Sequence, residues 1–244
     1  MTFDRYTWKA RIQPLLLVAL PCALLAFAAG TQQAVLEHVG TTIVTFGVVT
    51  LIAGMARDRG RCIEAHLWTS WGGPPTTTLM LSNADGPSPR LEDHRRHLRR
   101  LLPDTEPLTD ARDREEPDQT RGIIGRYTAH LRERTRDRSK FPIVADANST
   151  YGFRRNCLGL RPIAIAVALT TASVGGVLDG LSITGVSHVG SPAGLTLAST
   201  VSLATAIGWW RAGPAWVRTA ANYYAEALLD AAEALDPQTS TQVQ

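Results

Sequence analysis

The sequence is short of the residue patterns that mark the common enzyme and metal-site classes. It has three cysteines without a CxxC spacing, and only two of its 25 basic residues are lysine. Three scattered cysteines exclude a disulfide framework and a cysteine-rich zinc site. The chain also lacks a glycine-rich phosphate loop, a G-x-S-x-G elbow and an H-E-x-x-H helix. We therefore expect no catalytic residues, no metal and no cofactor, and a role other than that of an enzyme.

What the chain does have is four long apolar segments, at 12–30, 39–56, 162–184 and 193–210. Each approaches the roughly 20 residues that a helix needs to cross a bilayer. They form two close pairs around a polar insert that holds 19 of the 25 basic residues and 15 of the 22 acidic ones. These features predict an all-α integral membrane protein with four transmembrane helices in two hairpins, a mainly helical insert and a C-terminal amphipathic helix.

The expected parts of the chain follow from these segments. They are a first transmembrane hairpin at 1–56, an Arg-rich domain at 57–160, a second hairpin at 161–211 and an amphipathic helix with a polar tail at 212–244.

Basic residues stand on one side of the four segments only. The short connections 31–38 and 185–192 contain no Lys or Arg. The other flanks carry Arg5, Lys9, Arg11, Arg57, Arg59, Arg61, Arg154, Arg155, Arg161, Arg211 and Arg218. Because basic loops stay inside, this predicts a multi-pass inner (plasma) membrane protein with both termini and the insert in the cytoplasm. Alternatively, Ala26-Phe27-Ala28 is the cleavage site of a signal peptide, which would leave three spans.

Asp179 is an acid inside the third segment, on a four-residue row with Thr171 and Gly175. Ionisable residues within a membrane are costly and mark functional sites. Two interpretations stay open for Asp179. It lines an ion pathway, or it lies close enough to the outer end of the helix to be solvated by interfacial water.

Small residues recur every four positions in the second pair of segments. Such rows let helices pack closely in lipid, where apolar burial drives no association. They predict either a tight hairpin within one chain or a homo-oligomer around a pore. The residues are Ala164, Ala168, Ala172, Gly176 and Gly180, followed by Gly190, Gly194, Ala198, Ser202 and Ala206.

Arginines cluster in the insert. They would hold the domain at the anionic surface of the lipid bilayer, or bind an anionic small ligand or a cytoplasmic protein. Nucleic acid is a less suitable partner, because acidic residues are interleaved and no recognised fold motif is present. The candidates are Arg95, Arg96, Arg99, Arg100, Arg126, Arg132, Arg134, Arg154 and Arg155.

Periodicity predicts the secondary structure of the polar regions. Helices are expected at 90–102, at 120–140 and from Pro214 onward, and the second apolar segment should continue as helix to about Trp68. The β-branched stretch 76–82 predicts a short strand, paired with an extended 141–144.

The layout resembles that of bacterial four-span effectors of stress and antiviral systems, which join a membrane unit to a cytoplasmic sensing domain. The resemblance lies in the architecture and covers no diagnostic residues. It implies a channel-like or membrane-perturbing oligomer gated through its cytoplasmic domain. The alternative is a non-conducting, membrane-anchored scaffold or sensor that recruits a cytoplasmic partner.

Overall fold

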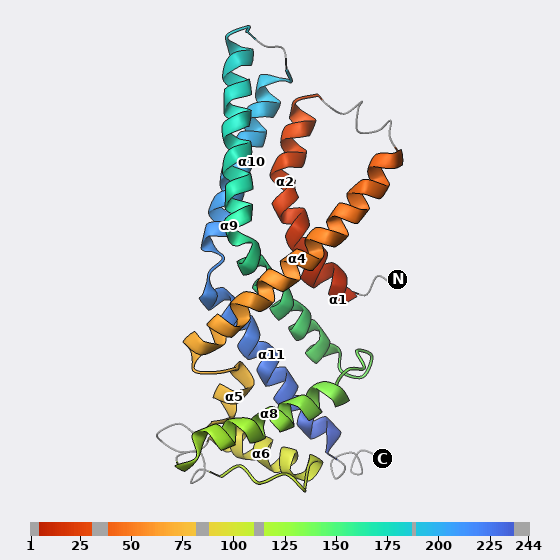
Figure 1. The fold of residues 1–244 in the computed structure, drawn as a ribbon, viewed down its shortest axis with the longest axis vertical. Helices are drawn as coiled ribbons and strands as arrows, with labels where there is room; N and C mark the ends of the chain where they lie inside the picture. Colours follow the sequence, from red (N-terminus) through yellow and green to blue (C-terminus); the bar gives the residue numbers. More distant parts are fainter. Residues whose placement is uncertain (1–4, 31–38, 82–87, 110–114, 187–188, 237–244) are drawn as a thin grey trace. The chain divides into compact units, whose positions relative to one another are not determined.

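All elements of the described part of the chain are helices (Figure 1). The computed structural model describes residues 5–30, 39–81, 88–109, 115–186 and 189–236, and only the backbone of Arg5, 39–53 and Ala56. The elements are α1 (Arg5–Thr7), the π-helical turn η1 (Trp8–Ile12), α2 (Gln13–Ala28), α4 (Val39–Trp71), α5 (Pro75–Met80), α6 (Pro89–Leu101), α8 (Pro117–Arg134), α9 (Pro142–Ile183), α10 (Pro192–Arg211) and α11 (Pro214–Leu235).

Proline and serine set where several of these helices begin. The helices from α5 to α11 all start at a proline, whose fixed φ suits the first turn and whose missing N–H is not needed there. Ser88 and Ser191 stand just before α6 and α10. Their hydroxyls accept hydrogen bonds from the N–H groups of Leu91 (3.3 Å) and Gly194 (3.2 Å), which caps both helices.

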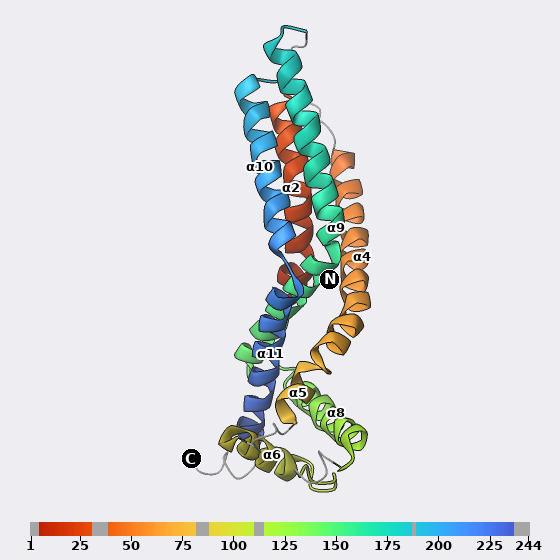
Figure 2. The same ribbon diagram turned by 90° about the vertical axis from the view of Figure 1, so that its left-hand side faces the viewer.

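The chain forms two compact units, each made from two separate stretches. Unit 1 comprises Met1–Glu64 and Gly152–Val217, and unit 2 comprises Ala65–Tyr151 and Arg218–Gln244. Within unit 1, α2, α10 and the unit 1 part of α9 lie side by side in both views (Figures 1 and 2).

The unit 1 parts of α4 and α9 cross in close contact through two glycines. A Cβ on Gly159 would lie 2.9 Å from the backbone nitrogen of Gly60 and 3.0 Å from the carbonyl carbon of Arg59. Beside this crossing, Asn156 is buried and its Nδ2 donates a hydrogen bond to the carbonyl of Ala10, at 2.7 Å. Only glycine lets the two backbones approach this closely, so the crossing depends on both positions.

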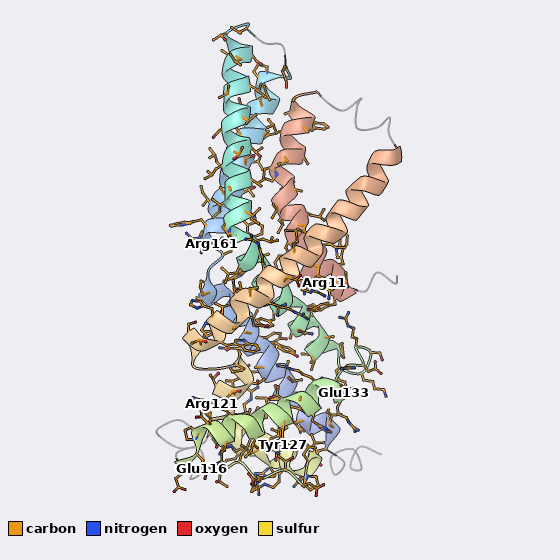
Figure 3. All side chains as sticks on the ribbon, in the orientation of Figure 1. Arg11, Glu116, Arg121, Tyr127, Glu133 and Arg161 are labelled. Carbon is orange, nitrogen blue, oxygen red and sulfur yellow. The ribbon has the colours of Figure 1, made fainter. Side chains whose placement is uncertain are left out.

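The core of unit 2 lies among α6, α8 and α11. Tyr127, at the middle of α8 (Figure 3), is 2% exposed and belongs to a core cluster with apolar residues of all three helices. Burial raises the pKa of its phenol. The other fully buried members of this core include Leu98, Ile123, Ile124, Leu131, Leu228 and Ala232, together with Met80 of α5 and Ala147 of α9.

The strand predicted at 76–82 is wrong, because Pro75–Met80 is the helix α5. The amides of Thr77 and Thr78 both donate to the carbonyl of Pro74, at 2.9 and 3.0 Å, which closes the first turn. The partner segment is helical as well, since α9 begins at Pro142. Proline at the helix start therefore outweighs the β-branched propensity of the threonines.

The helix predicted at 120–140 begins earlier and ends earlier than expected, as α8 runs from Pro117 to Arg134. The Thr135 hydroxyl donates to the carbonyl of Leu131, at 2.8 Å, and caps its end. A turn follows in which Oδ1 of Asp137 accepts hydrogen bonds from the hydroxyl of Ser139 and from its amide, at 2.5 and 2.9 Å, and these bonds lower the pKa of Asp137.

Two helical segments of the described chain are long and apolar enough to cross a membrane, Trp8–Ala28 and α9. They correspond to the first and third of the four predicted spans. Burial covers only 28% of the first segment's apolar window and 39% of the second's, so neither is a typical core helix. The fourth predicted span is the helix α10, which is not among the candidates. Much of the second lies at 39–53, whose side chains are not described.

Candidate functional site

The acid of the third predicted span contacts the fourth. Asp179 of α9 is half-buried, and its Oδ2 accepts a hydrogen bond from the hydroxyl of Thr196 on α10, at 2.7 Å. Its Oδ1 is enclosed and has no hydrogen-bond partner among the described residues. A carboxylate enclosed in this way is costly unless the second oxygen finds a donor. The site therefore has unused capacity for a cation, a proton or a water molecule.

Thr171 and Gly175 extend the same face of α9 away from Asp179. A Cβ on Gly175 would overlap the hydroxyl of Ser199 on α10, so glycine permits this approach. Thr171 is buried, and its hydroxyl lies 3.6 Å from the sulfur of Cys22 on α2. The three sequence candidates thus share one polar face, which we call the Asp179 row (Thr171, Gly175 and Asp179), and this face is directed at α2 and α10.

The small-residue row on α9 is only partly used in packing. Ala164, Ala168 and Ala172 are buried, whereas Gly176 and Gly180 are exposed, and a Cβ at either glycine would meet nothing within 4 Å. Positions four apart drift by about 40° at each step, because a helical turn has 3.6 residues. Along α9, the face that packs against the neighbouring helices therefore changes from the row that contains Ala172 to the Asp179 row.

The matching row on α10 is buried from its second turn onward, at Ala198, Ser202 and Ala206. Gly190 and Gly194 lie before and at the start of this helix, against Ala28 at the end of α2. Gly190 has a φ of +75°, which disfavours any other residue. These contacts join the ends of α2 and α10.

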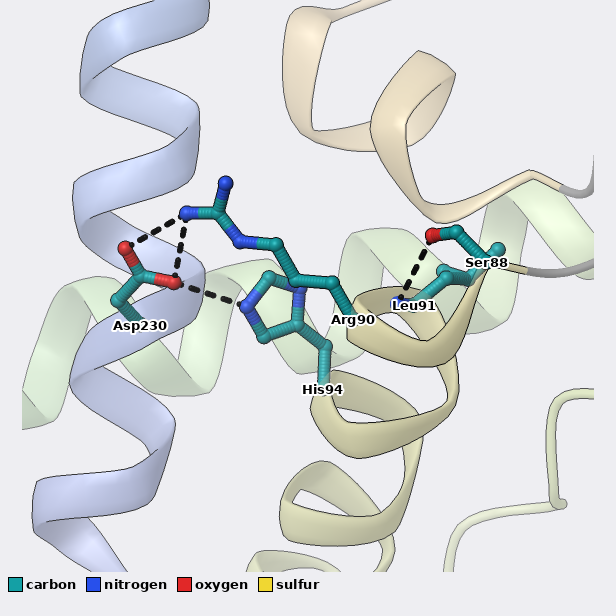
Figure 4. Close-up of polar contacts among 5 residues, drawn as sticks. All are labelled: Ser88, Arg90, Leu91, His94 and Asp230. Carbon is teal, nitrogen blue, oxygen red and sulfur yellow. Dashed lines mark hydrogen bonds and ion pairs between the residues drawn. The ribbon is translucent and has the colours of Figure 1, made fainter.

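A second polar site, in unit 2, joins α6 to α11. Arg90 donates from Nη2 to both carboxylate oxygens of Asp230, at 3.1 and 3.0 Å, and Nε2 of His94 lies 2.9 Å from Oδ1 (Figure 4). Partial burial raises the pKa of Asp230, but the hydrogen bonds from His94 and Arg90 outweigh burial and lower it overall. The same pairing raises the pKa of Arg90. We call these three residues the Asp230 cluster.

The arrangement repeats at the end of α11, in an Asp236 cluster made of His97, Arg100 and Asp236. His97 Nδ1 lies 2.9 Å from Oδ2 of Asp236, and Arg100 Nη1 donates to the same oxygen at 3.0 Å. Asp236 is fully buried, whereas Asp230 has an exposed side chain. The second carboxylate is therefore far more sheltered from solvent.

Most arginines named from the sequence make contacts within their own unit. Arg95 is buried and donates to the carbonyl of Met80, at 2.9 Å, and Arg96 pairs with Asp93, at 2.8 Å. Arg155 is also buried, with Nη1 2.8 Å from Oε1 of Glu64. These three side chains therefore make contacts that stabilise the fold.

Four of the named arginines are exposed and make no hydrogen bond or ion pair with another described residue. They are Arg99 on α6 and Arg126, Arg132 and Arg134 on α8. Figure 3 shows Arg121 and Glu133 on the same helix, where Arg121 pairs with Asp118 at 3.0 Å. The unpaired cations of α8 are thus the part of the arginine set that is open to an anionic partner.

Sequence reasoning missed both carboxylates that bind the α6 histidines. His94 and His97 stand at helical spacing within the helix predicted at 90–102, but this spacing does not reveal a partner. Their partners, Asp230 and Asp236, are more than 130 positions away in the sequence. The one signal in the sequence is a row of polar residues along the predicted C-terminal helix, and this row includes Asp230. Within the described residues, no three His, Cys, Asp or Glu side chains are grouped to hold a metal ion.

Comparisons of this chain with protein-family models, with curated proteins and with solved structures give no match. The site therefore has to be interpreted from its own chemistry.

Proposed function

We propose that this chain is a four-span inner membrane protein that assembles into a channel-like or membrane-perturbing oligomer, gated through its cytoplasmic domain. Asp179 carries the proposal. It is an acid in a helix apolar enough to cross a membrane, and its Oδ1 has no donor among the described residues. An intramembrane acid with a free oxygen suits a site that a cation or proton visits during conduction.

The surface of unit 1 supports the membrane placement. Large apolar side chains are exposed along α2, α9 and α10, including Phe27 (66%), Val177 (63%) and Ile207 (60%). A surface of this kind suits lipid rather than water. The four spans and the cytoplasmic termini rest on the distribution of arginines along the sequence.

The oligomer is supported by small residues that packing within the chain leaves open. Gly176 and Gly180 of α9 are exposed and have free space around them. Close approach of a second chain would use such positions.

The test is ion leak from cells or liposomes that contain the full chain, compared with Asp179→Asn and Asp179→Leu. Asp179→Asn keeps the size and the acceptor for Thr196 but removes the charge, so we expect reduced cation flux with normal membrane insertion. Asp179→Leu should lower flux further. Equal flux in all three proteins would overturn the role of Asp179, and absence of leak from the inserted wild-type chain would overturn conduction.

A second candidate function is a non-conducting scaffold or sensor, favoured by the exposed arginines of α8. Arg126, Arg132 and Arg134 are unpaired among the described residues and free to bind an anionic ligand or an acidic protein surface. The probe is ATP or inorganic pyrophosphate, titrated against the full chain in neutral nanodiscs. Binding that disappears in the triple Gln variant, in a chain that conducts nothing, would favour this function over the first.

A further inference from the structure

Unit 1 contains an open apolar groove that neither proposed function uses. Its volume is about 350 Å³, within the range of small-molecule sites in proteins. The lining comes from α2, α9, α10 and the start of α11, all within unit 1. The lining residues are Leu17, Leu20, Phe153, Cys157, Thr205, Gly208, Trp209, Ala212 and Trp216.

Water is a poor occupant for this groove. Thr205 contributes the one hydroxyl of the lining, and it donates to the carbonyl of Val201 at 2.8 Å. A bound water needs two to four polar partners, and an apolar cavity without them stays dry or takes an apolar molecule. The rim residues Leu17 and Leu20 are 42% and 41% exposed, so the groove opens onto the apolar exterior of unit 1.

One end of the groove is cationic. The guanidinium carbon of Arg154 lies 5.0 Å from the ring centroid of Trp216, and Arg154 Nη1 donates to the carbonyl of the same residue at 2.9 Å. Phe153 meets the Trp216 ring edge-on, with centroids 6.2 Å apart, so this wall is held in place from two sides. Among the described residues, the other N–H donors of Arg154 have no hydrogen-bond partner and could bind an anion.

The stretches of chain next to the groove contain no acid, although α9 carries Asp179 farther along and Glu64 of α4 pairs with Arg155. The stretches 5–30, 152–178 and 193–217 contain no Asp or Glu, whereas Arg211 follows directly on Trp210 at the end of α10. An apolar groove that opens toward lipid, with a cation at one end and no carboxylate nearby in the sequence, is complementary to an anionic amphiphile.

We propose that this groove is a binding site for an anionic phospholipid of the surrounding bilayer, with one acyl chain between α2 and α10 and the phosphate at Arg154. The proposal rests on the membrane placement proposed above, but not on conduction. A tightly held lipid would fill the space beside Trp209 and Trp216 and complete the packing of α2 against α10.

Gly208 provides a direct test, because a Cβ added there meets nothing within 4 Å and the residue lines the groove. Gly208→Phe should fill the groove without displacing backbone. Gly54→Phe is the matched control, since a Cβ on Gly54 also meets nothing within 4 Å and its helix α4 contributes no residue to the groove. Arg154→Gln removes the cation, with Arg134→Gln on α8 as its control.

The measurement is native mass spectrometry of the full chain, extracted from bilayers of equal phosphatidylglycerol and phosphatidylcholine. We expect one retained phosphatidylglycerol, preferred about tenfold over phosphatidylcholine. Retention should be lost in Gly208→Phe and kept in Gly54→Phe. The preference should fall to near unity in Arg154→Gln and remain in Arg134→Gln.

The proposal would be overturned if the two glycine variants retained lipid equally, or if the wild-type chain retained the two lipids equally. It would also be overturned if the chain were extracted as a dimer that holds no lipid. A second measurement needs no substitution. Brominated phosphatidylglycerol should quench the tryptophan fluorescence of the wild-type chain more than brominated phosphatidylcholine, and equal quenching would count against the site. A chain found in the soluble fraction would instead refute the membrane placement itself.

Discussion

His97 and Asp236 join the last turn of α6 to the end of α11, with Nδ1 of His97 2.9 Å from Oδ2 of a fully buried carboxylate. Arg100 binds the same oxygen. The Asp236 cluster thus fixes the C-terminal end of α11 on α6 through a charge that solvent does not reach. The Asp230 cluster makes a similar connection at an exposed position.

Removing the buried carboxylate should therefore cost more than removing the exposed one. Asp236→Ala leaves His97 and Arg100 without their shared acceptor, and we expect a loss of about 2–3 kcal/mol. Asp230→Ala, whose side chain is 51% exposed, should cost less than about 1 kcal/mol. Hydrogen exchange of the α11 amides in the full chain measures both. Equal protection in the two variants would contradict the difference in burial.

Acid should remove the contribution of Asp230. Hydrogen bonds from His94 and Arg90 keep its pKa below the usual 3.8 in the folded chain, despite partial burial. The folded state then binds fewer protons than the unfolded state, so the stabilisation is present above pH 3.8 and is lost as the pH falls through the folded pKa. In thermal unfolding scans, the difference in stability between wild type and Asp230→Asn should shrink as the pH falls below 3.8. A stability difference that increases as the pH falls would instead show that folding raises the pKa of Asp230.

The crossing of α4 and α9 should be intolerant of a single methyl group. Gly159→Ala would place a Cβ about 3 Å from the backbone of Gly60, and because backbone atoms cannot rotate away, we expect a loss of about 1–3 kcal/mol. Gly176→Ala on the same helix meets nothing within 4 Å and should be neutral or slightly stabilising. The melting temperatures of the two variants in detergent measure this difference in stability. A Gly159→Ala protein as stable as Gly176→Ala would mean that the two helices are not in contact.

The three cysteines test the membrane placement. Cys22 and Cys62 are exposed and Cys157 is buried, so water alone would leave the first two reactive. If α2 lies in lipid, a membrane-impermeant maleimide should label Cys62 in inside-out vesicles and spare Cys22. The intact mass of the protein gives the number of labelled cysteines. Detergent-solubilised protein is the control, in which Cys22 should react. Labelling of both residues in vesicles would contradict a membrane-embedded α2.

Local sequence signals predict the individual helices well where an apolar period and a start signal agree. The helix predicted at 90–102 is confirmed as α6, and the one from Pro214 as α11. The continuation of the second apolar segment as helix to about Trp68 is confirmed by α4, which ends at Trp71. The strand at 76–82 fails because the hydrogen bonds after Pro74 decide the local structure, and the composition of the threonines does not reveal them.

Pairings between distant helices were beyond the sequence. The row of Asp179 was identified from spacing, but its partner Thr196 depends on how α9 and α10 rotate against each other. Likewise, nothing in a four-residue spacing distinguishes Gly175, which packs against α10, from Gly176, which does not. One hundred degrees of helix rotation separates these two neighbours.

The C-terminal position of α11 has a consequence for the order in which the protein is made. Leu228 and Ala232 of α11 complete the core that α6 and α8 begin, yet they lie roughly 130 residues after Leu98. At about 5–20 residues per second, the ribosome needs on the order of ten seconds to cover that distance. During that interval α9 and α10 are completed, while the faces of α6 and α8 that α11 covers stay exposed. Unit 2 is thus the last part of the nascent chain to fold. Chaperones that bind apolar segments therefore have the longest time to bind there.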